Sequence, residues 1–333
     1  MMLNSKYIFI LLSTALASGL DARLTYAQSP SDWKPQRPIE IVVPVTAGGG
    51  IDRPARVLHQ IWTESRMVSV PVTVSNKPGG GQGVGLNYVH QAAGDAHRFA
   101  LMSSPLLSNY ITGSSKLQYT DFTILGQLFT EYMVVSVKAD SPLRNATDMV
   151  ARLKPAPDAL SAAIGTALGN TTHMSIGLPL KRAGVDIKRM KNVVFPSAGQ
   201  SMTAMLGGHV DVAASTLSIA APHRRSGKLR MLAITAPKRV AGEFGDVPTW
   251  KELGVDVTVS NWRFITAPAG LTAAQIAWWD ALFARTVQSP AWKKVLDEQY
   301  WIDDYVPSRA ARKYLDHENA EAREILTDLG LAK

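Results

Sequence analysis

The sequence predicts an α/β protein built as two lobes, each with a doubly wound sheet, around a cleft. Three observations predict this fold class. Short apolar runs alternate with amphipathic stretches from Arg37 onward, the same alternation restarts after Glu131, and glycine-containing loops separate several apolar runs from the helical stretches that follow. Strands that alternate with helices are typical of βαβ units and a parallel sheet.

The N-terminal residues 1–27 have the layout of a secretory signal peptide. The basic residue Lys6 precedes an apolar stretch over 8–20, and a small-residue site ends at Ala27. The apolar stretch is about 13 residues long, whereas a permanent membrane anchor needs about 20. We therefore expect cleavage near Ala27 and a mature protein in the periplasm, with an uncleaved anchor as the alternative.

The composition excludes several classes of site. The 333-residue chain has no cysteine, so disulfides, catalytic thiols, thiolate metal sites and acylation of a cysteine are ruled out. With 46% hydrophobic residues, two lobes of ordinary domain size can each bury a core. Stability is therefore expected to come from packing alone.

The formal net charge of +8 favours anionic partners. The basic residues are scattered, and their densest groups, around Arg224 and around Lys188, have no aromatic residues among them. Nucleic-acid sites combine clustered basic residues with stacking aromatic side chains. We therefore expect a small acidic solute as the partner and no nucleic acid.

The first lobe is expected over residues 33–130 plus 262–333. Apolar residues at helical spacing predict a helix after its first strand, with Ala55, Leu58, Ile61 and Trp62 on one face. Its predicted strands cover 39–43, 70–74 and 99–102, and further helices are predicted over 86–92 and from Thr272, Ser289 and Ser308 onward.

The second lobe is expected over residues 131–261. Its predicted strands cover 160–164, 193–195, 210–214 and 231–234, and its predicted helices cover 147–153, 174–183 and 202–206. The chain is expected to cross between the lobes at 131–137 and at 261–267.

Three glycine-containing loops, each between a strand and a helix, are the sharpest candidate binding features. They cover residues 44–52, 165–173 and 196–201. Glycines let backbone N–H groups turn toward a ligand, and a helix start adds roughly half a positive charge. One such loop is equally compatible with a tight turn that binds nothing. Three of them predict anion donors on both sides of a cleft, because open α/β sheets bind ligands at the carboxyl ends of their strands.

Motifs for cofactor binding and catalysis are missing. The glycines of 79–85 lack the G-x-G-x-x-G spacing of dinucleotide sites, and no G-x-S-x-G or H-E-x-x-H motif occurs. His173 fits a donor at a helix start better than a base, and no group is evident that would orient a histidine beside Ser197. We therefore expect no catalytic residue, no metal site and no cofactor.

Several short motifs are spread from about Trp33 to the last helix. They are Arg37-Pro38-Ile39, Ala47-Gly48-Gly49-Gly50 with Asp52 and Ala55-Arg56, Asn76-Lys77-Pro78-Gly79, Gly207-Gly208-His209-Val210-Asp211, Ser226-Gly227-Lys228-Leu229-Arg230, Val247-Pro248-Thr249 and Ala267-Pro268-Ala269-Gly270. Together they resemble the solute receptors of tripartite tricarboxylate transporters, the Bug or TctC family.

The resemblance implies the periplasmic-binding-protein, or flytrap, fold, in which two glycine loops hold the carboxylate of the ligand, partly through water. It implies two partners, a small carboxylate and the membrane subunits of the transporter; we also expect a monomer. The candidate ligand-binding residues are Thr46, Ala47, Gly48, Gly49, Ile51, Asp52, Arg53, Gly165, Thr166, Gly169, Asn170, Thr171, His173, Ser197 and Ser215.

The chain departs from the family pattern at three places near the expected cleft. Many members have threonine or tryptophan at the position of Ile51 and an uncharged residue at the position of Arg53, and Phe264 stands where a small residue is usual. The resemblance therefore leaves the carboxylate open. The expected function is capture of a di- or tricarboxylate without chemistry. The alternatives are a receptor that signals to a sensor protein and a periplasmic hydrolase.

Overall fold

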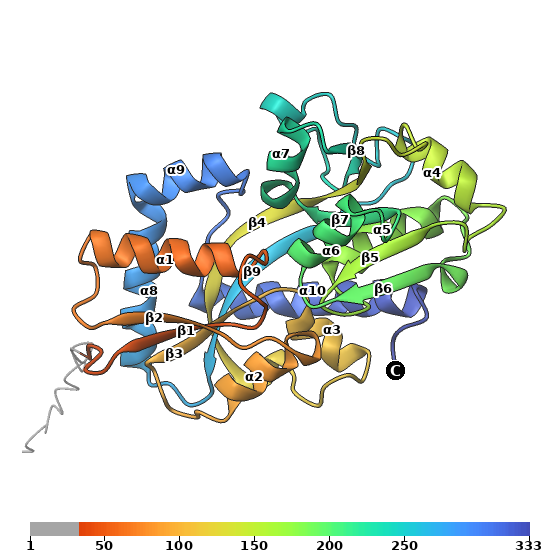
Figure 1. Ribbon diagram of the computed structural model, residues 1–333. Coiled ribbons are helices and arrows are strands. Elements are labelled where there is room, and N and C mark those ends of the chain that lie inside the picture. The colour runs from red at the N-terminus through yellow and green to blue at the C-terminus, as the bar shows by residue number, and fades with distance from the viewer. Residues whose placement is uncertain (1–32) are drawn as a thin grey trace, which may run out of the picture. The chain divides into compact units, whose positions relative to one another are not determined.

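The computed structural model describes residues 33–333. These residues form one mixed sheet of ten strands (Figure 1). The strand order is β2-β1-β3-β9-β4-β7-β5-β6, and β8 and β10 pair with β4 off this path. The strands are β1 (Ile39–Val43), β2 (Val72–Asn76), β3 (Arg98–Met102), β4 (Phe122–Lys138), β5 (Ser161–Gly165), β6 (Lys191–Phe195), β7 (Val212–Thr216), β8 (Leu229–Ile234), β9 (Ser260–Pro268) and β10 (Val306–Pro307).

Helices connect these strands and cover the sheet. They are α1 (Asp52–Glu64), α2 (Gly83–His90), α3 (Pro105–Ile111), α4 (Ala146–Leu153), α5 (Thr171–Arg182), α6 (Ala198–Leu206), α7 (Leu217–Arg225), α8 (Ala273–Gln288), α9 (Pro290–Gln299) and α10 (Ser308–Asp328), with short 3-10 helices η1 (Gly80–Gln82), η2 (Tyr119–Asp121), η3 (Ile187–Arg189) and η4 (Gly242–Phe244). The predicted alternation of strands and helices is confirmed, with bounds that differ from the expected ones by a few residues.

Two parallel groups of strands lie on either side of an antiparallel pair. β1 pairs in parallel with β2 and β3, which we call the β1 group, and β5 pairs in parallel with β6 and β7, the β5 group. Between them, β9 and β4 run antiparallel to each other and to their neighbours. The two predicted sheets are joined because β4 is 17 residues long and pairs with β9 along its first part and with β7 and β8 along its last. Both predicted crossings lie within β4 and β9.

The strand β1 is buried on both faces. Ile39, Ile41 and Val43 belong to the core formed with α1, α8 and α9, whereas Val42 belongs to the core formed with α2, α3 and α10. Successive side chains of a strand point to opposite faces. A continuous apolar run such as β1 is therefore what a strand covered on both faces requires.

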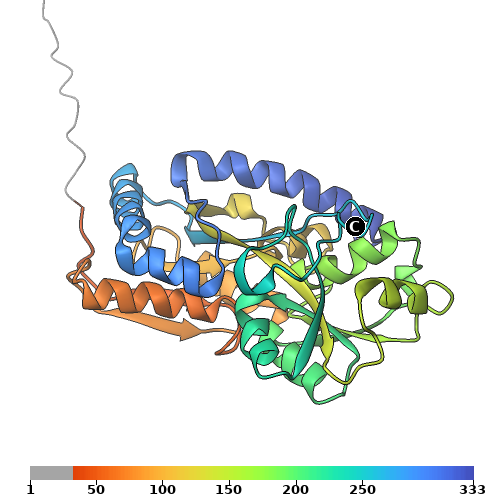
Figure 2. The same cartoon turned by 90° about the horizontal axis from the view of Figure 1, so that it is seen from above.

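The long helix α10 passes both groups of strands. Seen from above, it runs from the side of α8 and α9 toward α5 (Figure 2). It contacts α3 and β4, and the Asp328 carboxylate at its end forms an ion pair with Lys181 of α5. The C-terminal segment thus links the β1 group to the β5 group.

The predicted signal peptide, residues 1–27, lies outside the described residues. Between residues 33 and 333, no helix combines the length and apolar character needed to cross a membrane. The proposed lobe bounds at 130/131 and 261/262 stay a prediction, since the described residues belong to one compact unit.

Candidate functional site

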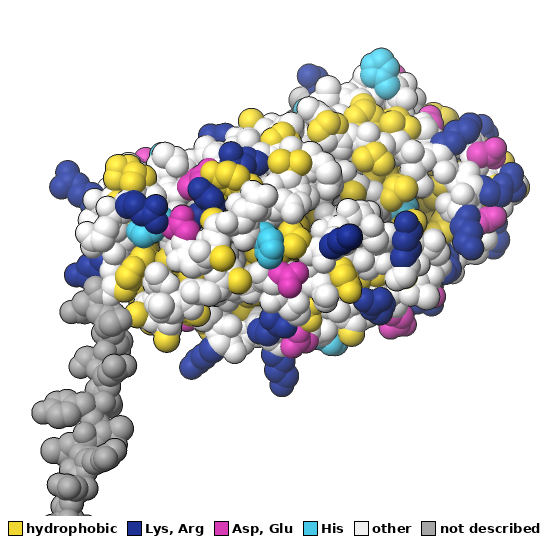
Figure 3. Space-filling view, turned by 90° about the horizontal axis from the view of Figure 1, so that it is seen from below, with side chains coloured by type: hydrophobic (Ala, Val, Ile, Leu, Met, Phe, Trp, Pro, Cys, Tyr) yellow, Lys and Arg dark blue, Asp and Glu magenta, His cyan; other side chains and the backbone are white. Residues whose placement is uncertain are grey.

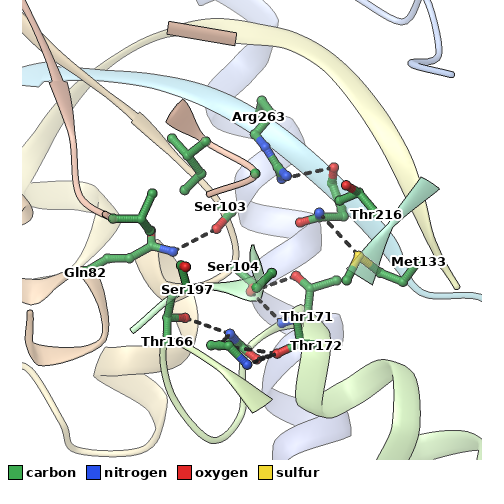
Figure 4. Close-up of a pocket in the computed structure, with 17 residues that line it drawn as sticks. Gln82, Ser103, Ser104, Met133, Thr166, Thr171, Thr172, Ser197, Thr216 and Arg263 are labelled. Atoms are coloured by element: carbon green, nitrogen blue, oxygen red, sulfur yellow. Dashed lines mark hydrogen bonds between the residues drawn. The ribbon is translucent and has the colours of Figure 1, made fainter. Parts of the chain in front are cut away.

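A pocket opens at the carboxyl ends of the parallel strands of both groups (Figure 4). It is bordered by the turns that follow β1, β3, β5, β6 and β7 and by the middle of β4 and β9. Open α/β sheets bind their ligands at this edge. The lining residues are Val45, Gly50, Ile51, Gln82, Ser103, Ser104, Met133, Gly165, Thr166, Asn170, Thr171, Thr172, Ser197, Ala198, Thr216, Asn261 and Arg263.

Asp52 shapes the loop between β1 and α1. Its carboxylate accepts hydrogen bonds from the amide of Gly48 at 3.0 Å, from Arg56 at 2.7 and 3.0 Å, and from Asn76 at 2.9 Å. Burial disfavours the charged form, but the hydrogen bonds outweigh burial and lower the pKa of Asp52. The Asp52 carboxylate is therefore ionised and occupied by hydrogen bonds to the loop, α1 and β2, while the side chain of Arg53 beside it is exposed.

Glycines let this loop approach the opposite wall. A Cβ at Gly49 would lie 2.9 Å from Cγ2 of Val45 and 3.4 Å from Cβ of Ser197. A Cβ at Gly199, in the first turn of α6, would lie 3.1 Å from the carbonyl oxygen of Gly48. The loop after β1 and the loop after β6 are therefore in contact beside the pocket.

The loop between β5 and α5 is held by its own polar side chains. Asn170 caps α5, since its Oδ1 accepts a bond from the amide of His173 at 3.0 Å, and its Nδ2 donates to the carbonyl of Gly165 and to Oγ1 of Thr166. Thr166 has a φ of +70°, a left-handed conformation that is uncommon for residues other than glycine. Such strain persists only where the surroundings impose it, and it clusters at functional sites.

The turn after β3 joins the start of α5. The hydroxyl of Ser104 accepts hydrogen bonds from the amide and the hydroxyl of Thr171, each at 2.8 Å. Next to it, Ser103 accepts a bond from Gln82 at 3.1 Å, and Gln82 also has a positive φ, +77°. Because its oxygen accepts both bonds, the O–H of Ser104 is available as a donor to the pocket.

Of the two serines predicted to bind the ligand, Ser197 lines the pocket and Ser215 does not. Ser197 caps α6 and lines the pocket, and its Oγ accepts a bond from the amide of Gln200 at 3.2 Å. Ser215 is fully buried, and its hydroxyl donates to the carbonyl of Thr216 at 3.2 Å. Helix starts leave their first N–H groups without intrahelical partners, so the start of α6 supplies donors to the pocket.

Arg263, on β9, is the only charged side chain among the described residues that line the pocket. Its side chain is 3% exposed and forms an ion pair with Glu131 of β4, which is 2% exposed. Its Nη1 also donates to the carbonyls of Trp262 and Asn261, at 3.0 and 3.3 Å. Burial raises the pKa of Glu131 to about 7 although the nearby guanidinium opposes this. Figure 4 shows the guanidinium at the opposite end of the view from Thr166 and Thr172.

His173 is a structural residue of the α5 start. It is 6% exposed, and its Nδ1 accepts a hydrogen bond from the amide of Gly169 at 3.1 Å. Burial lowers the pKa of His173 to about 4, so the ring is neutral at neutral pH. It is not among the described residues that line the pocket.

The pocket offers hydrogen-bond donors and one cation. Hydroxyl groups, helix-start amides and a guanidinium converge on it, and none of its described lining residues is acidic. Within residues 33–333 there is also no cluster of histidine, aspartate and glutamate side chains that could hold a metal ion. This chemistry suits an anion with several acceptor oxygens.

A family model described as the tripartite tricarboxylate transporter family receptor matches residues 55–331. The chain belongs to this receptor family. It is 30% identical over 251 residues to the protein BugT of Bordetella pertussis, covering 72% of this chain and 73% of BugT. It is also 29% identical over 308 residues to the UPF0065 protein in the gbd 5' region of Cupriavidus necator, covering 92% of each chain.

Solved structures share the fold of this receptor-family chain. The periplasmic binding protein BugD matches with a TM-score of 0.80 at 23% identity, over 90% of this chain and 99% of BugD. MatC from Rhodopseudomonas palustris with bound malate matches with a TM-score of 0.79 at 21% identity, over 88% and 99% of the two chains. An R. palustris protein with adipate reaches 0.82 at 22% identity, over 90% and 99%. The predicted periplasmic-binding-protein fold is confirmed.

The pocket of this receptor-family chain brings together some of the predicted site residues. Those that line it are Ile51, Gly165, Thr166, Asn170, Thr171 and Ser197. A wider neighbouring cavity, with Arg56 and His223, is lined by Gly48, Gly49, Asp52 and Arg53. Among the described residues, Thr46, Ala47, Gly169, His173 and Ser215 line neither of these two cavities. The binding role of each residue stays a prediction.

Some lining residues lie within the three predicted loops although they were not named as candidate ligand-binding residues: Val45, Gly50, Thr172 and Ala198. The lining residues outside those loops are Gln82, Ser103, Ser104, Met133, Thr216, Asn261 and Arg263. Arg263 had one usable signal, because it is a charged residue within an otherwise mostly apolar segment, 261–267, that was predicted to cross between the lobes. Ser103 and Ser104 follow a strand end but have no glycine beside them, so they lacked the loop signature that marked the other turns.

Proposed function

We propose that this chain is a periplasmic receptor that captures a small di- or tricarboxylate and delivers it to the membrane subunits of a tripartite tricarboxylate transporter. One observation carries the proposal. The pocket combines three loop–helix junctions with a buried arginine, and its described lining contains no acidic side chain. Malate in MatC and adipate in the R. palustris protein are ligands of the proposed class.

In the proposed complex, one carboxylate lies among the donors at the starts of α5 and α6. The hydroxyls of Ser104 and Thr166 and the helix-start amides of Thr172 and Ala198 supply these donors. Backbone N–H groups at helix starts bind anions without a cationic side chain. Glycines in the loop after β1 allow its backbone to close against the loop after β6.

The surface also supports a small anion over a polyanion. Lys and Arg side chains are scattered over the face shown in Figure 3, with acidic side chains between them. The formal net charge of +8 still raises the local concentration of small anions near the protein.

A thermal-shift screen of ligand-stripped protein against a panel of carboxylic acids tests this function. The panel contains malate, adipate, succinate, citrate, glutamate and benzoate, with sulfate and sodium chloride as controls. A ligand at a hundred times its Kd adds about 2.7 kcal/mol of stability, which raises the Tm by several degrees. A panel without any shift beyond the sulfate control would contradict the proposal.

A further inference from the structure

A buried ion pair forms the end of the pocket where β4 and β9 pair. Arg263 reaches the pocket surface, whereas Glu131 is not among the lining residues and lies behind it. In the strand register, Glu131 faces Asn261 of β9, two residues from Arg263. A Cβ on Gly50 would lie 3.4 Å from Nη2 of Arg263, so the loop after β1 closes over the guanidinium.

The guanidinium of Arg263 has unused donors. Three of its five N–H groups are engaged, two by the carbonyls of Asn261 and Trp262 and one by Glu131. Nε is buried without a hydrogen-bond partner, and one N–H of Nη2 is also free. Buried donors are almost always paired in native proteins, and an arginine with two free donors is suited to a carboxylate.

The existing pair limits how strongly a second anion can be held. An ionised Glu131 cancels the charge of Arg263, so an incoming carboxylate would add an uncompensated negative charge to a buried site, which is costly. A protonated Glu131 removes this cost, because one cation then faces one anion. The occupied site is therefore most stable with a proton on Glu131.

We propose that the Glu131–Arg263 pair is a proton-coupled subsite for a second carboxylate of the ligand, which binds Arg263 while Glu131 takes up a proton from bulk solvent. This inference rests on the proposed function, since it assigns the far end of the same ligand. In the protonated state, an O–H bond forms on Glu131 and its negative charge is lost, while Arg263 keeps its charge and pairs with the ligand.

The groups around Glu131 leave Arg263 as its charged neighbour. Thr216, at the end of β7, and Trp301, after α9, lie close to its carboxyl and are neutral. The carboxyl of Asp304, which follows α9, interacts with Thr130 and Gln127. Tyr132, the next residue of β4, has a pKa raised by burial and by Asp304 and stays neutral.

The pH dependence of binding follows from these charges. Burial raises the pKa of Glu131 to about 7 in the empty site, and an added carboxylate beside Arg263 raises it further. Between these two values the complex holds one more proton than the free protein, so affinity falls as pH rises. The Kd therefore increases by up to about tenfold per pH unit above pH 7 and is flat below it.

Titration calorimetry with adipate and with malate tests the proton uptake. Binding heats at pH 7.5 in PIPES and in Tris, which differ in ionisation enthalpy, give the number of protons taken up. Both acids are fully ionised at this pH, so the proton has to bind to the protein. We expect uptake of most of one proton per bound dianion. An acid that binds without proton uptake contradicts this inference alone, whereas failure of the whole acid panel contradicts the proposed function.

Glu131→Gln separates the subsite from a structural role of the pair. Glutamine resembles the protonated glutamate, so this variant should bind without proton uptake, match the unmodified protein at pH 6, and bind about tenfold or more tightly than it at pH 8.5. A merely structural Glu131 predicts weaker binding of the variant at both pH values. Asp304→Asn, which removes another partly buried carboxyl, is the matched control and should keep the full uptake. If circular dichroism shows that Glu131→Gln is unfolded, the calorimetry of the unmodified protein in PIPES and Tris still tests whether a proton is taken up on binding.

Discussion

The hydroxyl of Ser104 stands 2.8 Å from both the amide nitrogen and the hydroxyl of Thr171, across 67 residues of sequence. This contact connects the start of α3, which follows β3 of the β1 group, to the start of α5, which follows β5 of the β5 group. The first turn of α5 lines the pocket. The position of its donors therefore depends on a side chain from the other group of strands.

Ser104→Ala should weaken ligand binding because both hydrogen bonds to Thr171 are lost. Each bond contributes about 0.5–1.5 kcal/mol, and the two together about 1–3 kcal/mol, so we expect Kd to rise by up to about a hundredfold. Ser108→Ala is the control, since Ser108 lies on the same helix and its buried hydroxyl has no hydrogen-bond partner. Calorimetry on both variants with the best acid of the panel measures the difference. Equal Kd values for the two variants would show that the link to Thr171 does not support the site.

Gly49→Val should abolish binding, whereas Arg53→Ala should cost little. A side chain at Gly49 would collide with Val45 and press on Ser197, which forces the loop after β1 away from the pocket. Arg53 is exposed, and an exposed charge pair contributes about 1 kcal/mol or less. Titration calorimetry gives both affinities, with circular dichroism as the folding control. A larger loss for Arg53→Ala would mean that Arg53, and not the loop backbone, holds the anion.

His173 should make the folded protein less stable in acid. Its pKa is about 4 in the folded state against 6.5 for an ordinary histidine, so between these values only the unfolded chain binds the proton. The free energy of unfolding therefore falls as pH decreases through this window, by about 1.4 kcal/mol per unit and roughly 3 kcal/mol in total.

Urea denaturation at pH 7 and pH 4.5 measures this loss. His173→Asn keeps an acceptor for the amide of Gly169 and removes the titrating ring, so its stability should depend less on pH. His317→Asn, at a position where the side chain is 73% exposed, should keep the full dependence. The assignment to His173 fails if all three proteins lose the same free energy between the two pH values.

Thr286→Val should destabilise the core through a single lost acceptor. Nε1 of Trp62 donates to Oγ1 of Thr286 at 2.8 Å in the core between α1 and α8. The isosteric valine leaves this buried N–H unpaired, which costs about 1–3 kcal/mol. Thr266→Val is the matched control, because the Thr266 hydroxyl is buried without a partner, and its removal should be nearly neutral. Equal urea midpoints for Thr286→Val and Thr266→Val would contradict this account.

The alternation of strands and helices was predictable because it depends on local periodicity. β1 appears at the predicted 39–43, and β9 and β4 contain the two predicted crossings. Loop chemistry was predictable for the same reason, since Asn170 and Ser197 each precede a helix and cap it through a bond to a backbone amide three residues on. These features require only residues close in sequence.

Which backbone N–H groups of a glycine loop are free to bind a ligand could not be predicted in the same way. Gly48 has a positive φ of +79°, as a glycine loop suggests, but its amide is used by Asp52 within the loop. The spacing of glycines in a loop does not show which N–H groups are already paired. That pairing depends on Arg56 and Asn76, which hold Asp52 in place from α1 and β2.

The sequence by itself determined the fold class, the receptor family and the loops that carry donors. Only the tertiary structure placed Arg263 at the pocket and Glu131 behind it. The side chains of a strand alternate between faces, so a slip of one residue would turn each of them the other way. The pairing of β4 with β9 contains two register shifts, between Ile124 and Gly126 and between Gln127 and Phe129. Such irregularities are set by packing between strands far apart in sequence, and local patterns contain no record of them.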